Sequence, residues 1–195
     1  MREKRIWYPG AIYHIMQRGI RRNEIFENQT DYETFLTILQ RYLVATGCTL
    51  HAYCLMTNHY HLLVQTGDIE IWKMMKGLAQ EYAQYYNNAK SLSGHVYDDR
   101  YKSCIIQDDR YFLQVSRYIH LNPVKAGMVT KPEQYKWSSY QTFIGRKKDS
   151  ITNYEKTLLY FGKEGVQGYI QFVEKQGQRY NEEEEQISAS IGERK

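Results

Sequence analysis

Short runs of alternating hydrophobic and polar positions predict four strands, and longer stretches with helical spacing separate them. The predicted strands cover residues 11–16, 48–55, 60–65 and 101–107. The middle two strands are close enough to form a hairpin around Met56-Thr57-Asn58. The first strand leads into a basic loop, Arg18-Gly19-Ile20-Arg21-Arg22.

Two helices are predicted between these strands. Thr30, with Glu33 three residues later, reads as a capping box that starts the first helix, and Gly47 is placed to stop it. Asp68 is placed to cap the second helix, and Gly94 breaks its pattern. The apolar stripe expected on the second helix consists of Trp72, Met75, Leu78, Ala79, Tyr82, Tyr85 and Tyr86.

A third helix starts at Asp108-Asp109 and is expected to end near Asn122, because Pro123 disfavours helical geometry in the residue before it. Short helices are expected at residues 154–161 and 166–173. The order β-α-β-β-α-β then predicts an α+β fold, a ferredoxin-like sandwich with an antiparallel sheet and helices on one face.

We expect one main domain over residues 1–130 and a helical extension packed on it over residues 131–176. Residues 177–195 form a polar, acidic tail that we expect to be mobile.

Composition narrows the class of protein. Of 195 residues, 42% are hydrophobic and 25% charged, which excludes a collagen-like or wholly disordered chain. No apolar run is long enough for a membrane span, and Met1–Arg5 leads into no apolar segment of the secretory type. Three cysteines, Cys48, Cys54 and Cys104, predict free thiols in a reducing cytoplasm.

Charge is unevenly distributed along the chain. Residues 1–150 carry 20 Lys and Arg against 14 Asp and Glu, whereas residues 151–195 carry 6 against 8, with an acidic run at Glu182–Glu185. A basic main body rich in aromatic residues is a modest indication of a polyanionic partner.

Two histidines stand out at the start of the third predicted strand, which we extend by one residue to include His59. Side chains alternate along a strand, so His59 and His61 share one face and Tyr60 points to the other. Two imidazoles in this arrangement can bind one divalent cation, or they can simply lie on a solvated face. The other histidines, His14, His51, His95 and His120, are interpreted as structural.

The third predicted helix offers a possible nucleophile. Gln114, Tyr118 and Asn122 are four residues apart and form one stripe beside the apolar face. From spacing alone, Tyr118 is either a residue at the edge of the core or a nucleophile. Asn122 before Pro123 also fits an N-cap of a short extra turn.

Four motifs together resemble the single-tyrosine HUH transposases, and most closely the REP-associated tyrosine transposases. They are Met56–Val64, Gly94–Ser103, Tyr118–Gly127 and Trp137–Tyr140, and the resemblance runs from about Tyr8 to Val173. It implies that His59 and His61 bind Mg²⁺ or Mn²⁺, that Tyr118 is the nucleophile, and that Asn122 is a third residue at the metal. Tyr60 departs from the aliphatic residue or Phe usual at the central HUH position.

The resemblance further implies a metal-dependent endonuclease and strand transferase that cleaves single-stranded DNA near a hairpin through a 5′-phosphotyrosine intermediate. Relatives act as a monomer or a homodimer, so both states stay open. DNA contacts are expected from five basic residues, Arg18, Arg21, Arg22, Arg100 and Lys102. The alternatives are a nucleic-acid-binding protein that does not cleave and a metal-binding protein with no nucleic-acid partner.

Overall fold

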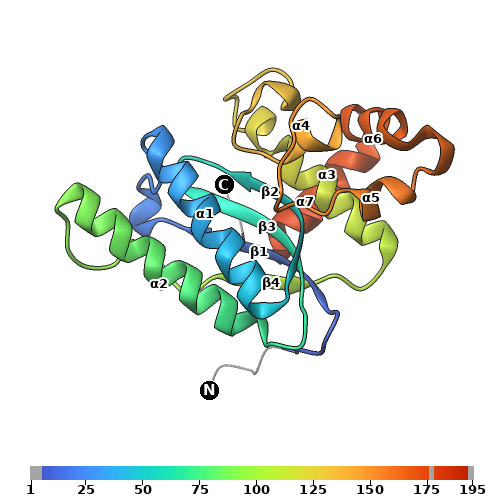
Figure 1. Ribbon diagram of the computed structural model, residues 1–195. Helices are drawn as coiled ribbons and strands as arrows, with labels where there is room; N and C mark the ends of the chain where they lie inside the picture. The colour runs from blue at the N-terminus through green and yellow to red at the C-terminus, as the bar shows by residue number, and fades with distance from the viewer. Residues whose placement is uncertain (1–5, 176–177, 193–195) are drawn as a thin grey trace.

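A four-stranded antiparallel sheet forms the centre of the computed structural model, which describes residues 6–175 and 178–192 (Figure 1). The strands lie in the order β2-β3-β1-β4. Their bounds are Ile12–Arg18 for β1, Thr49–Leu55 for β2, His59–Gln65 for β3 and Lys102–Ile105 for β4. The four predicted strands and the β2–β3 hairpin are therefore confirmed, with β4 shorter than expected.

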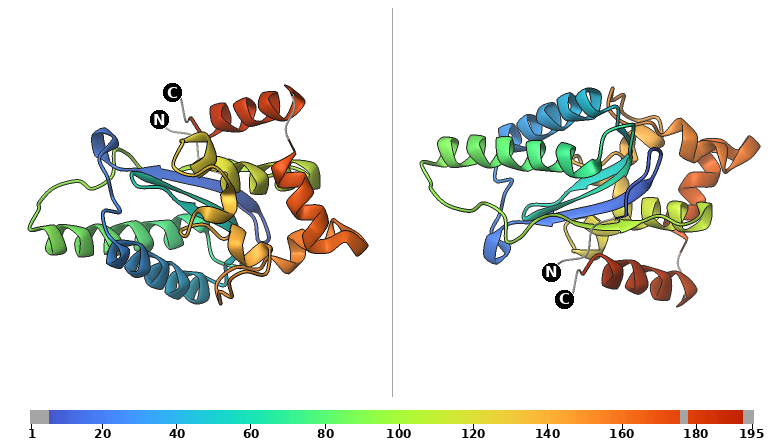
Figure 2. Two further views of the ribbon diagram at one scale, coloured as in Figure 1. Left: turned by 90° about the horizontal axis from the view of Figure 1, so that it is seen from above. Right: turned by 90° about the horizontal axis from the view of Figure 1, so that it is seen from below.

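Helices α1 (Gln29–Thr46) and α2 (Ile71–Lys90) cover one face of the sheet, and α3 (Asp109–Lys125) lies on the other (Figure 2). The α+β class and the order β-α-β-β-α-β are confirmed. Helices α1 and α2 cover one face as expected, and α3 packs on the other because strand β3 is buried on both sides. Leu62 packs in the core under α1 and α2, and its neighbour Leu63 packs in a second core with α3.

The first turn of α1 begins earlier than predicted. Asn28, not Thr30, is the N-cap, and it forms a capping box with Asp31 in place of Glu33. Gly47 ends the helix in the left-handed conformation, φ 64°, as its position predicted.

Helix α2 also differs from its prediction at the N-terminus. It begins after Glu70 instead of at Asp68, and Trp72 is 45% exposed although it was expected in the buried stripe. The buried side of the helix consists of Ile71, Met74, Met75, Leu78, Tyr82 and Tyr86.

Helix α3 begins at the predicted Asp108 cap but continues past Asn122 to Lys125. The expected stop at Pro123 is wrong. A proline removes one backbone donor and crowds the carbonyl four residues earlier. Here it lies in the last turn, where the amides of Ala126 and Met128 bond to the carbonyls of Asn122 and Pro123. Tertiary packing of this buried turn outweighs the local preference.

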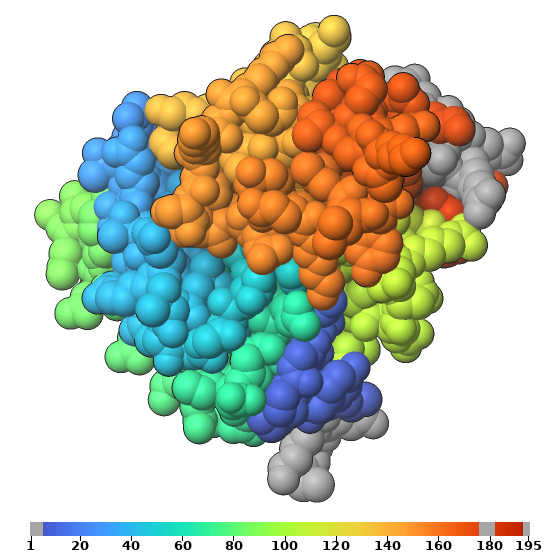
Figure 3. All heavy atoms as spheres, turned by 45° about the vertical axis from the view of Figure 1, so that its right-hand side comes forward, coloured from blue at the N-terminus to red at the C-terminus, as the bar shows by residue number. Residues whose placement is uncertain are grey.

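The chain beyond α3 packs on the same face of the sheet. It contains η2 (Pro132–Gln134), α4 (Tyr140–Phe143), α5 (Glu155–Leu159), η3 (Gly162–Glu164) and α6 (Gly165–Glu174). A bridge between Cys54 and Ser138 joins it to the edge strand β2. Phe143 and Tyr169 share a core with Phe112 of α3. In the space-filling view this segment forms a continuous layer in yellow and orange (Figure 3).

Residues expected in a mobile tail form helix α7, Gln178–Ser190, which packs against α3. Ile187 is buried, and two glutamates pair with basic residues of α3: Glu183 with Arg110 at 2.6 Å, and Glu184 with Arg117. Charge complementarity on one face therefore orders a segment whose composition suggested a solvated tail. Residues 177 and 193–195 of that expected tail, and Met1–Arg5 at the other end, lie outside the described residues.

The three cysteines, Cys48, Cys54 and Cys104, form no disulfide, in agreement with the prediction. Among the described helices, none has the length and apolar character needed to cross a membrane.

Candidate active site

The two histidines of the HUH motif lie side by side on β3, on the face toward α3. His61 is fully buried and His59 nearly so. Their ring centroids are 5.1 Å apart, with the rings nearly perpendicular. The strand alternation predicted from the sequence therefore places both imidazoles where they can approach one ligand.

Helix α3 brings Tyr118 against this pair. Its ring centroid is 5.7 Å from that of His61, in an edge-on arrangement, and the side chain is 3% exposed. The tyrosine and the HUH histidines, 57 residues apart in the sequence, thus meet in one site. This contact follows from α3 crossing the sheet face opposite α1 and α2.

A third histidine belongs to the same cluster. His14 of β1 is fully buried, its ring centroid lies 5.2 Å from His61 and 5.8 Å from Tyr118, and its Nε2 is 3.0 Å from His61 Nδ1. From the sequence His14 is interpreted as structural, and the structure places it in contact with both His61 and Tyr118. The contact between His14 and His61 depends on the pairing of β1 with β3. Met16 lies opposite His61 in this register, and His14 lies two residues before Met16 on the same face of β1.

Asn122 lies one turn after Tyr118 inside α3, so it does not cap a separate turn. Its Nδ2 donates to the Tyr118 carbonyl at 3.0 Å, and the side chain is buried. The amide oxygen is then the atom of Asn122 that is suited to a cation.

Lys125 is a further residue of the site that the sequence did not reveal. Its ammonium lies 4.4 Å from the centroid of the Tyr118 ring. It is also 2.7 Å from a carboxylate oxygen of Glu184 in α7. A cation beside a phenol favours the ionised form. The i,i+7 spacing of Tyr118 and Lys125 was available as a signal, but the predicted helix ended before Lys125.

The side chains expected to hold the ion, His59, His61 and Asn122, carry no acidic group. Among the described residues, no cluster of three or more His, Cys, Asp and Glu side chains could hold a metal ion. Two imidazoles and an amide oxygen remain as candidate ligands. This set suits a divalent ion such as Mn²⁺, which accepts both nitrogen and oxygen ligands. It also leaves the full charge of the ion for an anionic substrate.

The basic loop after β1 adjoins the histidines. Arg18 pairs with His59 in the β1–β3 register, and η1 (Ile20–Arg22) follows directly. Arg21 and Arg22 are exposed and adopt left-handed backbone conformations, φ 53° and 62°. Two hydrogen bonds join this loop to Asn58: Gly19 N donates to the Asn58 carbonyl at 2.8 Å, and Asn58 Nδ2 donates to the Arg22 carbonyl at 3.0 Å.

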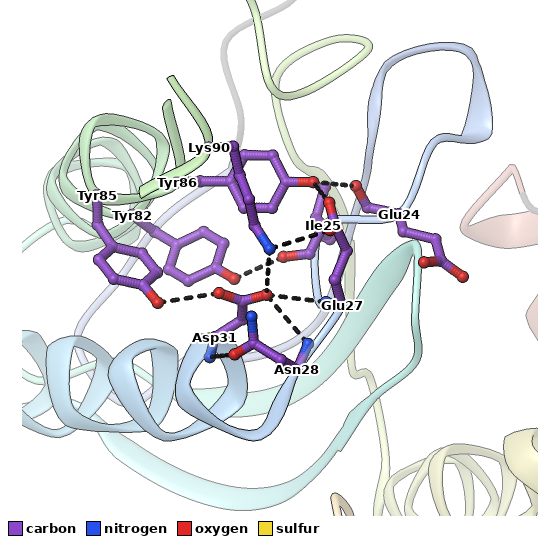
Figure 4. A network of polar contacts seen from close by, with 9 residues as sticks. All are labelled: Glu24, Ile25, Glu27, Asn28, Asp31, Tyr82, Tyr85, Tyr86 and Lys90. Atoms are coloured by element: carbon purple, nitrogen blue, oxygen red, sulfur yellow. Dashed lines mark hydrogen bonds and ion pairs between the residues drawn. The ribbon is translucent and has the colours of Figure 1, made fainter. Parts of the chain in front are cut away.

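A polar network holds residues 24–28, the segment that connects the basic loop to α1 (Figure 4). The buried carboxylate of Asp31 accepts from the backbone amides of Glu27 and Asn28 and from the Tyr85 hydroxyl, and it lies 3.5 Å from Lys90 Nζ. Hydrogen bonds from Tyr86 and Lys90 lower the pKa of Glu27.

Two tyrosines of α2 also bond to the backbone of this connecting segment. Tyr82 donates to the Ile25 carbonyl at 2.5 Å, and Tyr86 donates to the Glu24 carbonyl at 3.0 Å. Part of the tyrosine excess thus holds the loop in place and is not available for stacking or nucleophilic attack.

Arg100 and Lys102 are exposed at the β4 edge of the sheet. They line a groove of about 1130 Å³ with Trp7, Trp72 and Lys76. A backbone bridge between Gly19 and Tyr97 connects the segment before Arg100 to the basic loop. The five predicted cations therefore lie on two adjoining stretches of chain.

The remaining histidines are not part of the cluster. His120 is fully buried, bonded to Ser139 Oγ at 2.8 Å and to the Tyr169 hydroxyl at 2.7 Å, and burial lowers its pKa to about 3. His51 bonds to Gln65, burial lowers its pKa, and His95 is exposed.

Comparison with known proteins settles the family. The family model described as "Transposase IS200 like" matches residues 8–122, which include the HUH histidines, Tyr118 and Asn122. The chain belongs to the IS200-like transposases. Membership of this family implies an enzyme that cleaves and joins DNA. A search of curated proteins found no match.

Two solved structures resemble this IS200-like transposase. A REP-associated tyrosine transposase bound to a REP hairpin shares 18% identity, with a TM-score of 0.62 over 78% of this chain and 94% of the other. A candidate transposase from Deinococcus radiodurans R1 shares 20% identity, with a TM-score of 0.42 over 61% of this chain and 95% of the other. The first likeness shows a shared fold and agrees with the group that the sequence motifs indicated.

Proposed function

We propose that this IS200-like transposase is a metal-dependent endonuclease and strand transferase for single-stranded DNA, with Tyr118 as its nucleophile. The observation that carries the proposal is the packing of Tyr118 against His61, with His59 beside it, at the junction of β3 and α3. A buried tyrosine of one element that packs next to two imidazoles of another is unusual in a protein core. The same arrangement is suitable for phosphoryl transfer.

In the proposed reaction, the Tyr118 oxygen attacks a backbone phosphorus after losing its proton. A bond forms between the tyrosine oxygen and phosphorus, and the bond from phosphorus to the 3′ oxygen breaks. Tyr118 loses its proton to solvent, and the departing 3′ oxygen takes up a proton from solvent, so the protons balance. The resulting 5′-phosphotyrosine keeps the energy of the broken bond, so an incoming 3′ hydroxyl can reverse the step and join the strands.

His59, His61 and Asn122 would hold Mg²⁺ or Mn²⁺ in this site. The ion supplies charge neutralisation at the phosphate and at the departing oxygen. The chain itself orients the nucleophile: α3 fixes Tyr118 at its edge-on contact with His61, and Lys125 places a positive charge beside the phenol.

We propose that the DNA contacts the basic loop, through Arg18, Arg21 and Arg22, and the groove, through Arg100 and Lys102. Trp72, exposed in the same groove, offers a ring on which an unpaired base can stack. A hairpin next to the single strand is proposed as part of the substrate, because the structural relative was solved bound to a REP hairpin.

The test is a covalent trapping assay on a denaturing gel. The protein is incubated with Mn²⁺ or Mg²⁺ and single-stranded oligonucleotides, each with a hairpin, taken from the flanks of its gene. We expect an SDS-resistant protein–DNA band that EDTA and Tyr118→Phe abolish. Tyr111→Phe is the matched control, because Tyr111 lies on the same helix seven residues earlier and should leave the band intact. Binding without a covalent band across a hairpin library would instead favour a binder that does not cleave.

A further inference from the structure

Asn58, the residue before the HUH motif, uses both ends of its side-chain amide. Its Oδ1 lies 2.6 Å from His59 Nδ1, and its Nδ2 lies 3.0 Å from the Arg22 carbonyl oxygen. One short side chain therefore joins a candidate metal ligand to the basic loop.

The chemistry of these two contacts fixes the direction of each hydrogen bond. A backbone carbonyl can only accept, so the NH₂ end of the amide must face Arg22. The oxygen end then faces His59, and it can only accept a hydrogen from Nδ1. Neutral His59 is thereby held in the form that carries its hydrogen on Nδ1 and its lone pair on Nε2, the form in which Nε2 can bind a cation.

His61 contacts a different residue. Its Nδ1 lies 3.0 Å from His14 Nε2, and both rings are fully buried. The two HUH histidines thus contact different residues, and the contact of His59 leads through Asn58 to the loop that carries Arg21 and Arg22.

From this geometry, we infer that Asn58 is a positioning residue that couples the basic loop to the metal site by fixing both the Nδ1–H form of His59 and the conformation of residues 19–22. The inference rests on the proposed function for its consequence: contact of DNA with the loop and binding of the ion at His59 stabilise the same amide orientation. Each ligand should then raise the affinity for the other, because such coupling is reciprocal.

The first test uses the protein without metal or DNA. Long-range ¹H–¹⁵N NMR spectra identify the hydrogen-bearing nitrogen of each histidine, and amide exchange reports the turn formed by Arg22 N to Gly19 O and Asn23 N to Ile20 O. We expect Asn58→Ala to give a mixture of His59 forms and to speed exchange at Arg22 and Asn23 about 10-fold. The His61 form should stay as in the wild type, which also shows that the variant is folded.

The second test adds the ligands one at a time. Mn²⁺ affinity is measured by electron paramagnetic resonance without DNA, and oligonucleotide affinity is measured in EDTA. Asn58→Ala should weaken Mn²⁺ binding about 10-fold and should also weaken metal-free DNA binding. His14→Leu should weaken only Mn²⁺ binding, and Asn23→Ala, a change at an exposed residue of the same loop, should alter neither.

The experiments distinguish a failure of the proposed function from a failure of the coupling through Asn58. Absence of Mn²⁺ binding in the wild type would count against the proposed function, while the NMR test of Asn58 would still give an answer. An unchanged His59 form or unchanged loop exchange in Asn58→Ala would overturn the coupling, even if the wild type cleaves DNA.

Discussion

The sequence leaves two interpretations of Tyr118 open, and its contacts in the structure support the proposed role as nucleophile. As a helical residue beside an apolar stripe, it is indistinguishable from a core-edge tyrosine. The ring contacts with His61 and His14 place it in a polar cluster, and Lys125 adds a positive charge 4.4 Å from its ring centroid. A positive charge beside a phenol stabilises the ionised form.

Replacing Lys125 tests that argument. We expect Lys125→Gln to slow formation of the covalent adduct about 10-fold at neutral pH, because the phenolate loses the positive charge beside it. The rate should recover as the pH is raised, and Lys125→Arg should retain most of the wild-type rate. A uniform loss at every pH would mean that Lys125 supports α7 and not the phenolate. Lys163→Gln, at an exposed position, is the control.

His120 supplies a second prediction for a single residue. Burial lowers its pKa to about 3, whereas an unfolded chain protonates histidine near pH 6.5. The unfolded state therefore binds more protons below pH 6.5, and stability falls as the pH decreases toward 3. The contribution is about 1.4 kcal/mol per pH unit. Urea unfolding at pH 7, 6 and 5 should show a shallower decline for His120→Gln than for the wild type, and equal slopes would contradict the assignment.

At the scale of elements, the contacts between α7 and α3 could not be predicted from composition. Its glutamates read as a solvated acidic run, yet Glu184 pairs with Arg117, a nearly buried residue of the tyrosine-bearing helix, and with Lys125. Arg117 also donates to the carbonyls of Phe172 and Lys175. Sequence alone gives the charges of both helices, but not the approach of their faces, which depends on tertiary packing.

We expect Glu184→Ala to destabilise the protein by about 3 kcal/mol, because it leaves the Arg117 guanidinium buried without its carboxylate. Glu185→Ala, one position further along the same helix and exposed, should change stability by less than about 0.5 kcal/mol. Urea denaturation measures both. Equal small effects would show that α7 contributes little to the stability of the α3 face.

For the whole molecule, the sequence predicted the strands, the hairpin and the α+β class, because these follow from local periodicity. It also predicted that His59 and His61 share a face. What it missed depends on pairing and packing: the helix on the second face of the sheet, the extension of α3 through Pro123, and the arrival of His14 beside His61 through the β1–β3 register. The meeting of Tyr118 with the histidines was implied only by resemblance to a family.

The distribution of charged and aromatic residues over the surface leads to a last prediction, which separates two kinds of DNA contact. Contacts between phosphates and Lys or Arg release counterions, so log affinity falls with log salt by about 0.7 per contact on single strands. Replacing Arg21 and Arg22 together by Gln should therefore make the salt dependence shallower by about 1.4.

Trp72→Ala should act differently, because stacking releases no counterions. We expect it to weaken binding of single-stranded oligonucleotides by about 1–3 kcal/mol at every salt concentration and to leave the slope unchanged. Oligonucleotide titrations between low and high salt, followed by anisotropy, measure both the binding affinity and its dependence on salt. If Trp72→Ala binds like the wild type while the arginine variant is weakened, the single strand follows the basic loop and does not enter the groove.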